Sequence, residues 1–267
     1  MKDRIVQAVL FLLAAVILLP CLLLLVWMFT ERWAWPALLP QRFSLRAAAE
    51  VFGRRGELLK VFFSSVLIST AVAVLSAVIG VMTCRALVFY DFFGKRLMGF
   101  LTILPFMVPA TVFAMGIQLT FIKMGLNNTI SGVILAHLIC SLPYGVWLIM
   151  DGTKALGKEL EDQARVLGAS PWQAFYKVSL PVLAPVILSA ASMAYVVSFS
   201  QYFLTLMIGG GQVRTFSIVM VPYLQSGDRS MASVYSVLFL AVTLSVFGLY
   251  EWIGRKWTKD SEGGFYE

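Results

Sequence analysis

IVQAVLFLLAAVILLPCLLLLVWMF, residues 5–29, is a predominantly apolar run of 25 residues without a single charge. A helix needs roughly 20 mostly apolar residues to cross the hydrocarbon core of a bilayer, so this run is long enough to span it. The charged start at residues 1–4 has the layout of a signal peptide, but the apolar run is too long for one and no small-x-small cleavage site follows it. We therefore expect a retained first transmembrane helix.

Five further apolar runs follow along the chain. Of its 267 residues, 60% are hydrophobic and only 13% are charged, whereas roughly 25% of the residues of a soluble domain are charged. Lipid offers no hydrogen-bond partner to backbone groups, so each run must be helical. The sequence predicts an all-α membrane protein, a bundle of about six transmembrane helices that forms one domain over residues 1–267. The expected spans are Ile5–Phe29, Leu58–Cys84, Leu97–Ile122, Thr129–Met150, Val182–Ile208 and Ser230–Ile253.

The net charge of +7 comes from Lys and Arg residues outside the apolar runs. There they meet the headgroups of the lipid bilayer or set topology, so we expect no nucleic-acid function. The three cysteines, Cys21, Cys84 and Cys140, show no metal-ligand spacing. We expect no metal site and interpret them as small buried hydrophobic residues.

Basic residues also indicate which way the chain crosses the membrane. Six spans place both termini on one side, which carries twelve of the 21 Lys and Arg residues, while the other side carries nine. Cytoplasmic loops of membrane proteins are enriched in Lys and Arg. The count therefore favours cytoplasmic termini by a small margin, because the first long external loop is itself rich in arginine.

The loop at residues 151–181, DGTKALGKELEDQARVLGASPWQAFYKVSLP, is the most informative stretch outside the spans. It is too long and too patterned for a simple turn. Within Lys158–Leu167 the apolar residues recur at helical spacing and charged residues fill the other positions. Gly168 then supplies a C-terminal stop for this helix.

A second helix is predicted directly after the first. Ser170 at the N-cap, Pro171 at the first helical position and Gln173 three residues past the cap are typical of a helix start. A short helix should run to about Val178, and Leu180-Pro181 should end it. Two short helices broken at a glycine would form either a docking surface for another protein or an amphipathic loop on lipid headgroups, and the residue pattern leaves both open.

The spacing within this loop resembles a known motif. Asp162-Gln163-Ala164, three residues, Gly168, nine residues, Val178, one residue and Leu180-Pro181 resemble the EAA loop, Glu-Ala-Ala-x3-Gly-x9-Ile-x-Leu-Pro. This loop is found in permease subunits of binding-protein-dependent ABC importers of the MetI-like type I family. The spacing matches throughout, with Asp in place of Glu, Gln in place of Ala and Val in place of Ile.

The resemblance implies that the loop is a coupling helix, which sits in a cleft of a cytoplasmic ATPase subunit and transmits its movements to the spans. It implies that Asp162 matches the acidic position that pairs with a basic residue of the ATPase, and that Glu161 beside it could substitute. The small residues Ala164 and Gly168 would let the loop fit closely and turn. The implied ATPase-coupling residues are Glu161, Asp162, Ala164, Gly168, Ala169, Ser170, Pro171, Leu180 and Pro181.

An assembly is implied as well. The chain has no Gly-x4-Gly-Lys-Ser/Thr phosphate-binding loop. ATP and Mg²⁺ would therefore be bound by a separate ABC ATPase present in two copies, and this chain would bind no cofactor and would be a transport subunit, not an enzyme. Its other partners would be a second permease, identical or different, and an external solute-binding protein, in the inner (plasma) membrane of a bacterium.

The cargo and its path are less clearly marked. The segment SFSQYFLTLMIGGG at residues 198–211 resembles permeases for polyamines, thiamine and iron(III), which favours a polyamine-like cation by a small margin. Polar residues inside the spans could line a translocation path, and hydrogen bonding between helices explains them equally well. The candidate path residues are Gln118, His137, Tyr144, Ser198, Ser200, Gln201 and Tyr202.

Two rival functions belong to other classes. Proton- or sodium-coupled secondary transporters place acidic residues or several histidines inside their spans. Here the fourteen acidic residues lie in loops, termini or span edges, and the single histidine is His137. A membrane-embedded enzyme would need clustered His and carboxylate groups at membrane depth. The self-contained secondary transporter is the main alternative.

Overall fold

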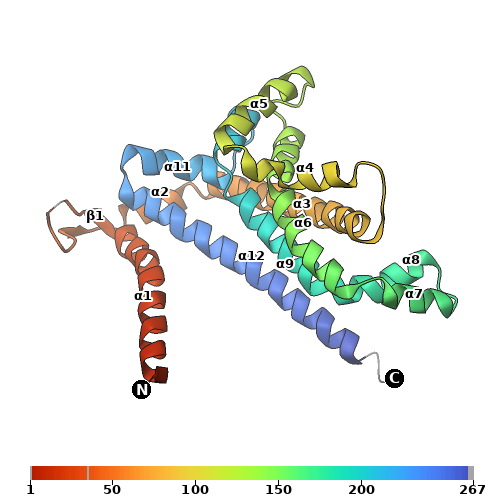
Figure 1. The fold of residues 1–267 in the computed structure, drawn as a ribbon. Helices are drawn as coiled ribbons and strands as arrows, with labels where there is room; N and C mark the ends of the chain where they lie inside the picture. Colours follow the sequence, from red (N-terminus) through yellow and green to blue (C-terminus); the bar gives the residue numbers. More distant parts are fainter. Residues whose placement is uncertain (1, 35, 264–267) are drawn as a thin grey trace. The chain divides into compact units, whose positions relative to one another are not determined.

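The computed structural model describes residues 2–34 and 36–263, and this part of the chain is helical apart from one short β-hairpin (Figure 1). Within these described residues, five helices are long and apolar enough to cross a membrane, or six if one sharply bent helix pair counts as a single span. The predicted all-α membrane fold is confirmed. The helices are α1 (Lys2–Met28), α2 (Arg46–Gly53), α3 (Arg55–Phe89), α4 (Lys95–Met107), α5 (Ala110–Lys123), α6 (Ile130–Leu156), α7 (Glu159–Val166), α8 (Pro171–Ala174), the π-helix η1 (Phe175–Ser179), α9 (Leu180–Phe199), α10 (Phe203–Gly209), α11 (Phe216–Ser226) and α12 (Arg229–Gly263).

The chain divides into two compact units. Unit 1 comprises Met1–Phe62 with Ile218–Val242, and unit 2 comprises Phe63–Ser217 with Thr243–Glu267. The three boundaries fall within the helices α3, α11 and α12. The single transmembrane domain expected from the sequence stays a prediction.

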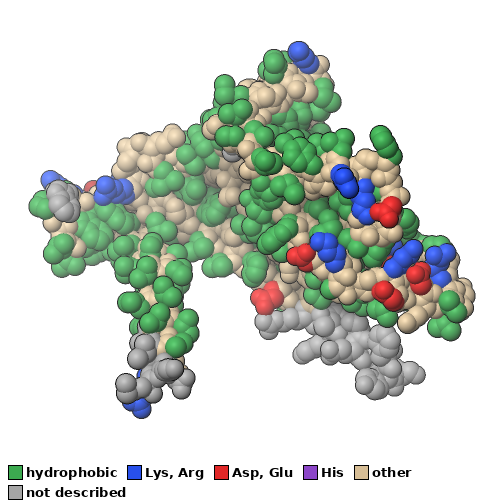
Figure 2. Space-filling view, viewed as in Figure 1, with side chains coloured by type: hydrophobic (Ala, Val, Ile, Leu, Met, Phe, Trp, Pro, Cys, Tyr) green, Lys and Arg blue, Asp and Glu red, His purple; other side chains and the backbone are tan. Residues whose placement is uncertain are grey.

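Unit 1 contains α1, whose most apolar part buries none of its residues within the described chain. Hydrophobic side chains cover this helix in the space-filling view (Figure 2). Directly after α1, β1 (Thr30–Arg32) pairs with β2 (Arg42–Phe43) in an antiparallel hairpin. An apolar helical surface of this kind is stable in contact with lipid or another apolar surface, and this is consistent with a transmembrane position.

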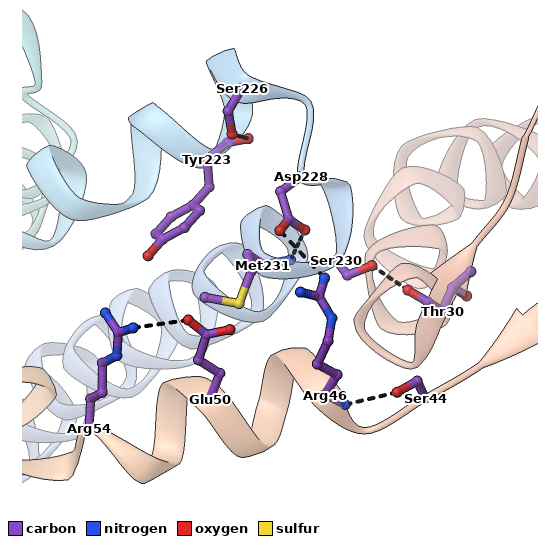
Figure 3. A network of polar contacts seen from close by, with 10 residues as sticks. All are labelled: Thr30, Ser44, Arg46, Glu50, Arg54, Tyr223, Ser226, Asp228, Ser230 and Met231. Carbon is purple, nitrogen blue, oxygen red and sulfur yellow. Dashed lines mark hydrogen bonds and ion pairs between the residues drawn. The ribbon is translucent and has the colours of Figure 1, made fainter.

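Polar contacts join the hairpin and α2 to the start of α12 within unit 1 (Figure 3). The hydroxyl of Ser230 donates a hydrogen bond to the backbone carbonyl of Thr30. Arg46 at the start of α2 lies 3.5 Å from the carboxylate of Asp228, the residue that precedes α12. The backbone N–H of Met231 also donates to this carboxylate, which therefore caps the first turn of α12. These contacts fix the local arrangement of α2 and the α12 start.

Unit 2 is built around α6 and α9, with α3 packed closely against α6. A Cβ added at Gly145 of α6 would lie 2.8 Å from the hydroxyl oxygen of Ser76 in α3, so the glycine lets the two helices approach closely. One apolar cluster joins α3, α5, α6 and α10 and comprises Ile68, Ala114, Phe121, Val133, Ala136, Leu204, Ile208 and Val213. A second cluster joins α3, α6 and α9 and comprises Val81, Cys84, Val146, Ile149 and Ala190.

The third expected span is not one continuous helix. It divides into α4 and α5, which are bent by 114° relative to each other. Val108 between them has extended backbone angles, and Pro109 is the N-cap of α5. A residue that precedes proline is disfavoured in the helical region, so the helix ends there.

The fifth expected span, Val182–Ile208, is too long at its C-terminal end. Helix α9 stops at Phe199, and a separate helix α10 begins at Phe203. The polar residues 200–202 divide two apolar segments that hydropathy alone merges into one run. Helix α11 is a further short helix that was not expected from the sequence.

Candidate functional site

The predicted loop at residues 151–181 begins on the last turns of α6 and ends on the first turn of α9. Gly157 has a φ of 69° and turns the chain out of α6. Helix α7 follows with Glu159, Glu161 and Asp162 in its first turn and Arg165 in its last. Acidic residues at the N-terminus of a helix and basic residues at its C-terminus both interact favourably with the helix dipole, which stabilises this short helix.

The turn after α7 has the geometry that the sequence predicts. Gly168 has a φ of 93°, in the left-handed region that favours glycine. The backbone N–H of Gly168 donates to the carbonyl of Arg165, and that of Ala169 donates to the carbonyl of Ala164. This pair of hydrogen bonds is a Schellman motif, which ends the helix and satisfies its last carbonyl groups.

The start of the second helix is also confirmed. The Ser170 hydroxyl accepts a hydrogen bond from the backbone of Gln173, and the Gln173 side chain accepts one from the backbone of Ser170. Pro171 occupies the first turn, where its missing N–H leaves no hydrogen bond unmade.

The predicted end of this second helix at Leu180-Pro181 is wrong. The chain continues from α8 through the π-helix η1 into α9 without a break. The Leu180 N–H donates to the carbonyl of Phe175, five residues earlier. In a regular α-helix the ring of Pro181 would clash with the carbonyl four residues before it, and the wider π turn precedes this position. The coupling loop is therefore continuous with the α9 span.

Glu161 lies on the inner side of α7, where only 7% of its surface is exposed. The guanidinium group of Arg85, near the end of α3, donates two hydrogen bonds to its two carboxylate oxygens, and the Nη2–Oε2 distance is 2.9 Å. The hydroxyl of Ser179 donates a further hydrogen bond to the same carboxylate. A bidentate ion pair of this kind fixes the relative orientation of the guanidinium and carboxylate groups as well as their distance.

Aromatic rings cover the guanidinium group of Arg85. Its central carbon lies 4.5 Å from the ring centre of Phe175 in η1 and 5.3 Å from that of Phe89 in α3. The pKa of the Glu161 carboxyl lies below its usual 4.5, mainly because Arg85 donates hydrogen bonds to the carboxylate. The hydrogen bond from Ser179 also lowers this pKa, whereas partial burial raises it. The carboxylate is therefore ionised at neutral pH.

Asp162 is exposed on the outer side of α7, 3.9 Å from Arg165 one turn away. Three large apolar side chains of the same loop are also exposed: Val166 is 87% exposed, Leu167 88% and Trp172 70%. Figure 2 shows basic and acidic side chains gathered over the segment that carries α7 and α8. We call this outer surface, made of Glu159, Asp162, Gln163, Val166 and Leu167, the loop face.

The predicted coupling residues thus divide between two environments. Asp162, Gly168, Ser170 and Pro171 are exposed, and Ala164, Ala169, Leu180 and Pro181 are partly exposed. Glu161 is buried and already paired within the chain. The two neighbouring acidic side chains therefore lie in opposite environments, Glu161 buried and Asp162 exposed. Contact with an ATPase stays a prediction for the whole set.

Of the candidate path residues, His137 and Ser198 are brought together in the interior of unit 2. Nδ1 of His137 lies 2.9 Å from the hydroxyl of Ser198, and Nε2 lies 2.9 Å from the hydroxyl of Thr205. The Thr205 hydroxyl donates to the carbonyl of Gln201, so it accepts from Nε2 of His137, and in a neutral ring Nδ1 then accepts from Ser198. His137 is 1% exposed, which places it in the packed interior.

The other candidate path residues make separate contacts. Gln118 donates from its side chain to the carbonyl of Met207, and Tyr144 packs edge-on against Phe106. The Ser200 hydroxyl donates to the carbonyl of Val197, three residues earlier. Gln201 accepts through its backbone carbonyl from Ser217, and Tyr202 precedes the first turn of α10. A role in a path stays a prediction for all seven residues.

Arg85, Ser179 and Thr205 belong to these sites but are not among the residues predicted from the sequence. Arg85 is a lone charge within the otherwise uncharged segment VMTCRALVF, residues 81–89. A charge at the end of a span needs either water or a partner, and this was the available signal. Nothing in the local sequence identifies Glu161 as that partner, because 76 residues separate the two.

Comparison with known proteins identifies the family. The family model for the inner membrane component of binding-protein-dependent transport systems matches residues 76–259, more than half of the chain. The chain belongs to this family. It is therefore a subunit of an ABC importer for a small solute, a multi-pass inner membrane protein and not an enzyme, and its partners are an ATPase and a solute-binding protein. The secondary transporter alternative is set aside.

Relatives of this permease carry different cargoes. A molybdate/tungstate transport system permease of Pyrococcus abyssi is 29% identical over 71% of this chain and 76% of its own. The sulfate transport system permease of Escherichia coli is 28% identical over 67% of this chain and 70% of its own. A bacterial ABC transporter for import of the polysaccharide alginate has the same fold, with a TM-score of 0.69 at 18% identity over 94% of this chain and 97% of the other.

Proposed function

We propose that residues 151–181 of this permease dock on the cytoplasmic ATPase through the loop face and couple ATP hydrolysis to solute import. The exposed apolar residues of the loop face carry this proposal, because such residues next to acidic and basic groups are typical of a protein-binding surface. ATP and Mg²⁺ would bind to two ATPase copies, and this chain would hold no cofactor. Two permeases, identical or different, would enclose the path.

Docking can be tested by changing one residue of the loop face. Val166→Glu should strongly reduce the amount of ATPase that co-purifies with the tagged chain in mild detergent, because it buries a charge at the contact. Leu38→Glu is a matched control, since Leu38 is 89% exposed and lies in the loop after the first span. Normal ATPase recovery with Val166→Glu would refute docking through this face.

We further propose that the cargo is a small oxyanion. The molybdate/tungstate and sulfate permeases, together with an aminoethylphosphonate permease that is 23% identical over 83% of this chain, support this class. The polyamine-like cation favoured by residues 198–211 has no support among these relatives. An arabinooligosaccharide permease at 28% identity keeps a neutral sugar as the second candidate.

The cargo proposal is tested with the reconstituted complex of permease, ATPase and binding protein. ATP hydrolysis should be stimulated by molybdate or sulfate and not by spermidine or an oligosaccharide. Stimulation by spermidine alone would refute an oxyanion cargo and support a polyamine cargo. Stimulation by an oligosaccharide alone would support a sugar cargo. Both termini should be cytoplasmic in this complex.

A further inference from the structure

We propose that Arg85 is a positioning residue that holds the coupling loop on the end of α3 through Glu161, so that a displacement of the loop is passed to the α3 span. The inference rests on the proposed docking of this loop on the ATPase. It assigns Glu161 a different task from Asp162: Glu161 acts through Arg85 inside the chain, whereas Asp162 faces outward.

One carboxylate joins three elements at this point. Glu161 belongs to α7, Arg85 to α3 and Ser179 to η1, directly before the α9 span. Two hydrogen bonds from one planar guanidinium resist both translation and rotation of α7 against α3, which a single contact would not. Movement of the loop therefore has to carry the end of α3 with it or break the pair.

The aromatic rings limit the remaining freedom of Arg85. Phe175 comes from the loop side and Phe89 from α3 itself, and both lie within contact distance of the guanidinium. An arginine side chain has several rotatable bonds, and covering rings restrict it to one geometry. The side chain is thereby a short, ordered link between the loop and the span.

Close packing continues from Arg85 into the spans. The adjacent Cys84 thiol donates to the carbonyl of Val146 in α6 at 3.2 Å, and Cys84 belongs to the apolar cluster that joins α3, α6 and α9. A Cβ added at Gly80 would lie 3.0 Å from Cδ1 of Ile149, so α3 and α6 are also closely packed one turn further in. Packed interiors transmit a displacement because they have little free volume to absorb it.

The test uses the assembled complex of permease, ATPase and binding protein in lipid vesicles. Arg85→Gln and Glu161→Gln should each lower the solute transported per ATP hydrolysed by about fivefold or more, in the range of a typical coupling between sites. The ATPase should still co-purify in normal amount, because the loop face is unchanged. Arg85→Lys should retain part of the coupling, since lysine keeps the charge but not the two-pronged contact.

The double variant Arg85→Gln with Glu161→Gln separates positioning from mere folding. If the pair served only to neutralise a buried charge, removing both charges would restore coupling, because the single variants are destabilised by the buried charge that is left without a partner. Positioning predicts that the double variant stays uncoupled. The double variant also remains informative if a single variant fails to fold. Restored or wild-type transport per ATP in the double variant would overturn the inference.

The exposed ion pair Lys95–Asp91 provides a matched control. Its 2.8 Å contact lies just beyond α3, outside the loop. Lys95→Gln should leave transport per ATP unchanged, whereas an equal loss there would overturn the specific role of Arg85. If the wild-type chain retained no ATPase, the proposed function itself would be contradicted. If Arg85→Gln bound the ATPase normally and its transport per ATP were unaltered, only the role of Arg85 would be contradicted.

Discussion

Glu161 is the residue whose ionisation state the structure defines most clearly. Arg85 lowers the pKa of its carboxyl below the usual 4.5, so the folded state binds the proton less readily than the unfolded state. The pair therefore stabilises the loop fully above pH 4.5, and this stabilisation is lost as the pH falls through the lowered pKa. Stability of the loop should consequently depend on pH only in the acidic range.

Hydrogen exchange of residues 159–179 tests this pH dependence. Protection, corrected for the intrinsic exchange rate, should be constant between neutral pH and about pH 5 and should decrease below that value. In Glu161→Gln the protection should be lower at neutral pH and nearly independent of pH. The same acid-induced decrease in Glu161→Gln would show that another group is responsible.

A second prediction at the level of one residue concerns the contribution of His137 to stability. Its ring joins Ser198 at the end of α9 to Thr205 in α10, and it is fully enclosed. His137→Phe should lower the free energy of unfolding by about 1–3 kcal/mol, because the Ser198 hydroxyl loses its partner in a buried site. The measurement is the thermal midpoint in detergent, with Ser189→Ala as the control for an exposed hydroxyl. Unchanged stability together with lost transport would support a path role instead.

Among the elements, the coupling loop depends on one backbone conformation. Gly168 has a left-handed φ, yet a Cβ built there meets no atom within 4 Å, so only the backbone conformation resists substitution. Gly168→Leu should cost roughly 1–2 kcal/mol in that conformation. The loop should then misplace α8 and reduce transport per ATP while the spans remain folded.

Gly168→Asn is the matched control for this turn, because asparagine tolerates the left-handed region better than leucine. It should retain most of the transport activity in vesicles. Wild-type transport by Gly168→Leu at equal expression would contradict a requirement for this turn.

For the whole molecule, the question is whether the bent pair α4–α5 crosses the membrane once. Leu38 follows the first span and Val166 lies in the coupling loop, and both are almost fully exposed. Single cysteines at these positions, in a chain without its three native cysteines, should be labelled from opposite sides if the pair is one crossing. Labelling from the same side would mean five crossings and would contradict a cytoplasmic coupling loop opposite an external first loop.

Much of this permease could be predicted from sequence because the relevant signals are local. Apolar runs of about 20 residues are helical in lipid whatever surrounds them, and the stop at Gly168 and the start at Ser170 are set by side chains within four residues of each turn. The break in the fifth span was missed, because hydropathy averages over the few residues at which a helix ends. The break in the third span lies at Pro109, and a proline inside an apolar run is itself a local signal for a kink.

The partners of Glu161 and His137 emerged only from the fold. Arg85 lies 76 residues before Glu161, and Thr205 lies 68 residues after His137, so no local pattern connects them. Which of two adjacent acidic residues faces inward depends on how α7 is rotated against α3 and α9, and this rotation is set by packing. Side-chain pairing across distant helices is a property of the folded chain, because the bundle alone brings these groups within hydrogen-bond distance.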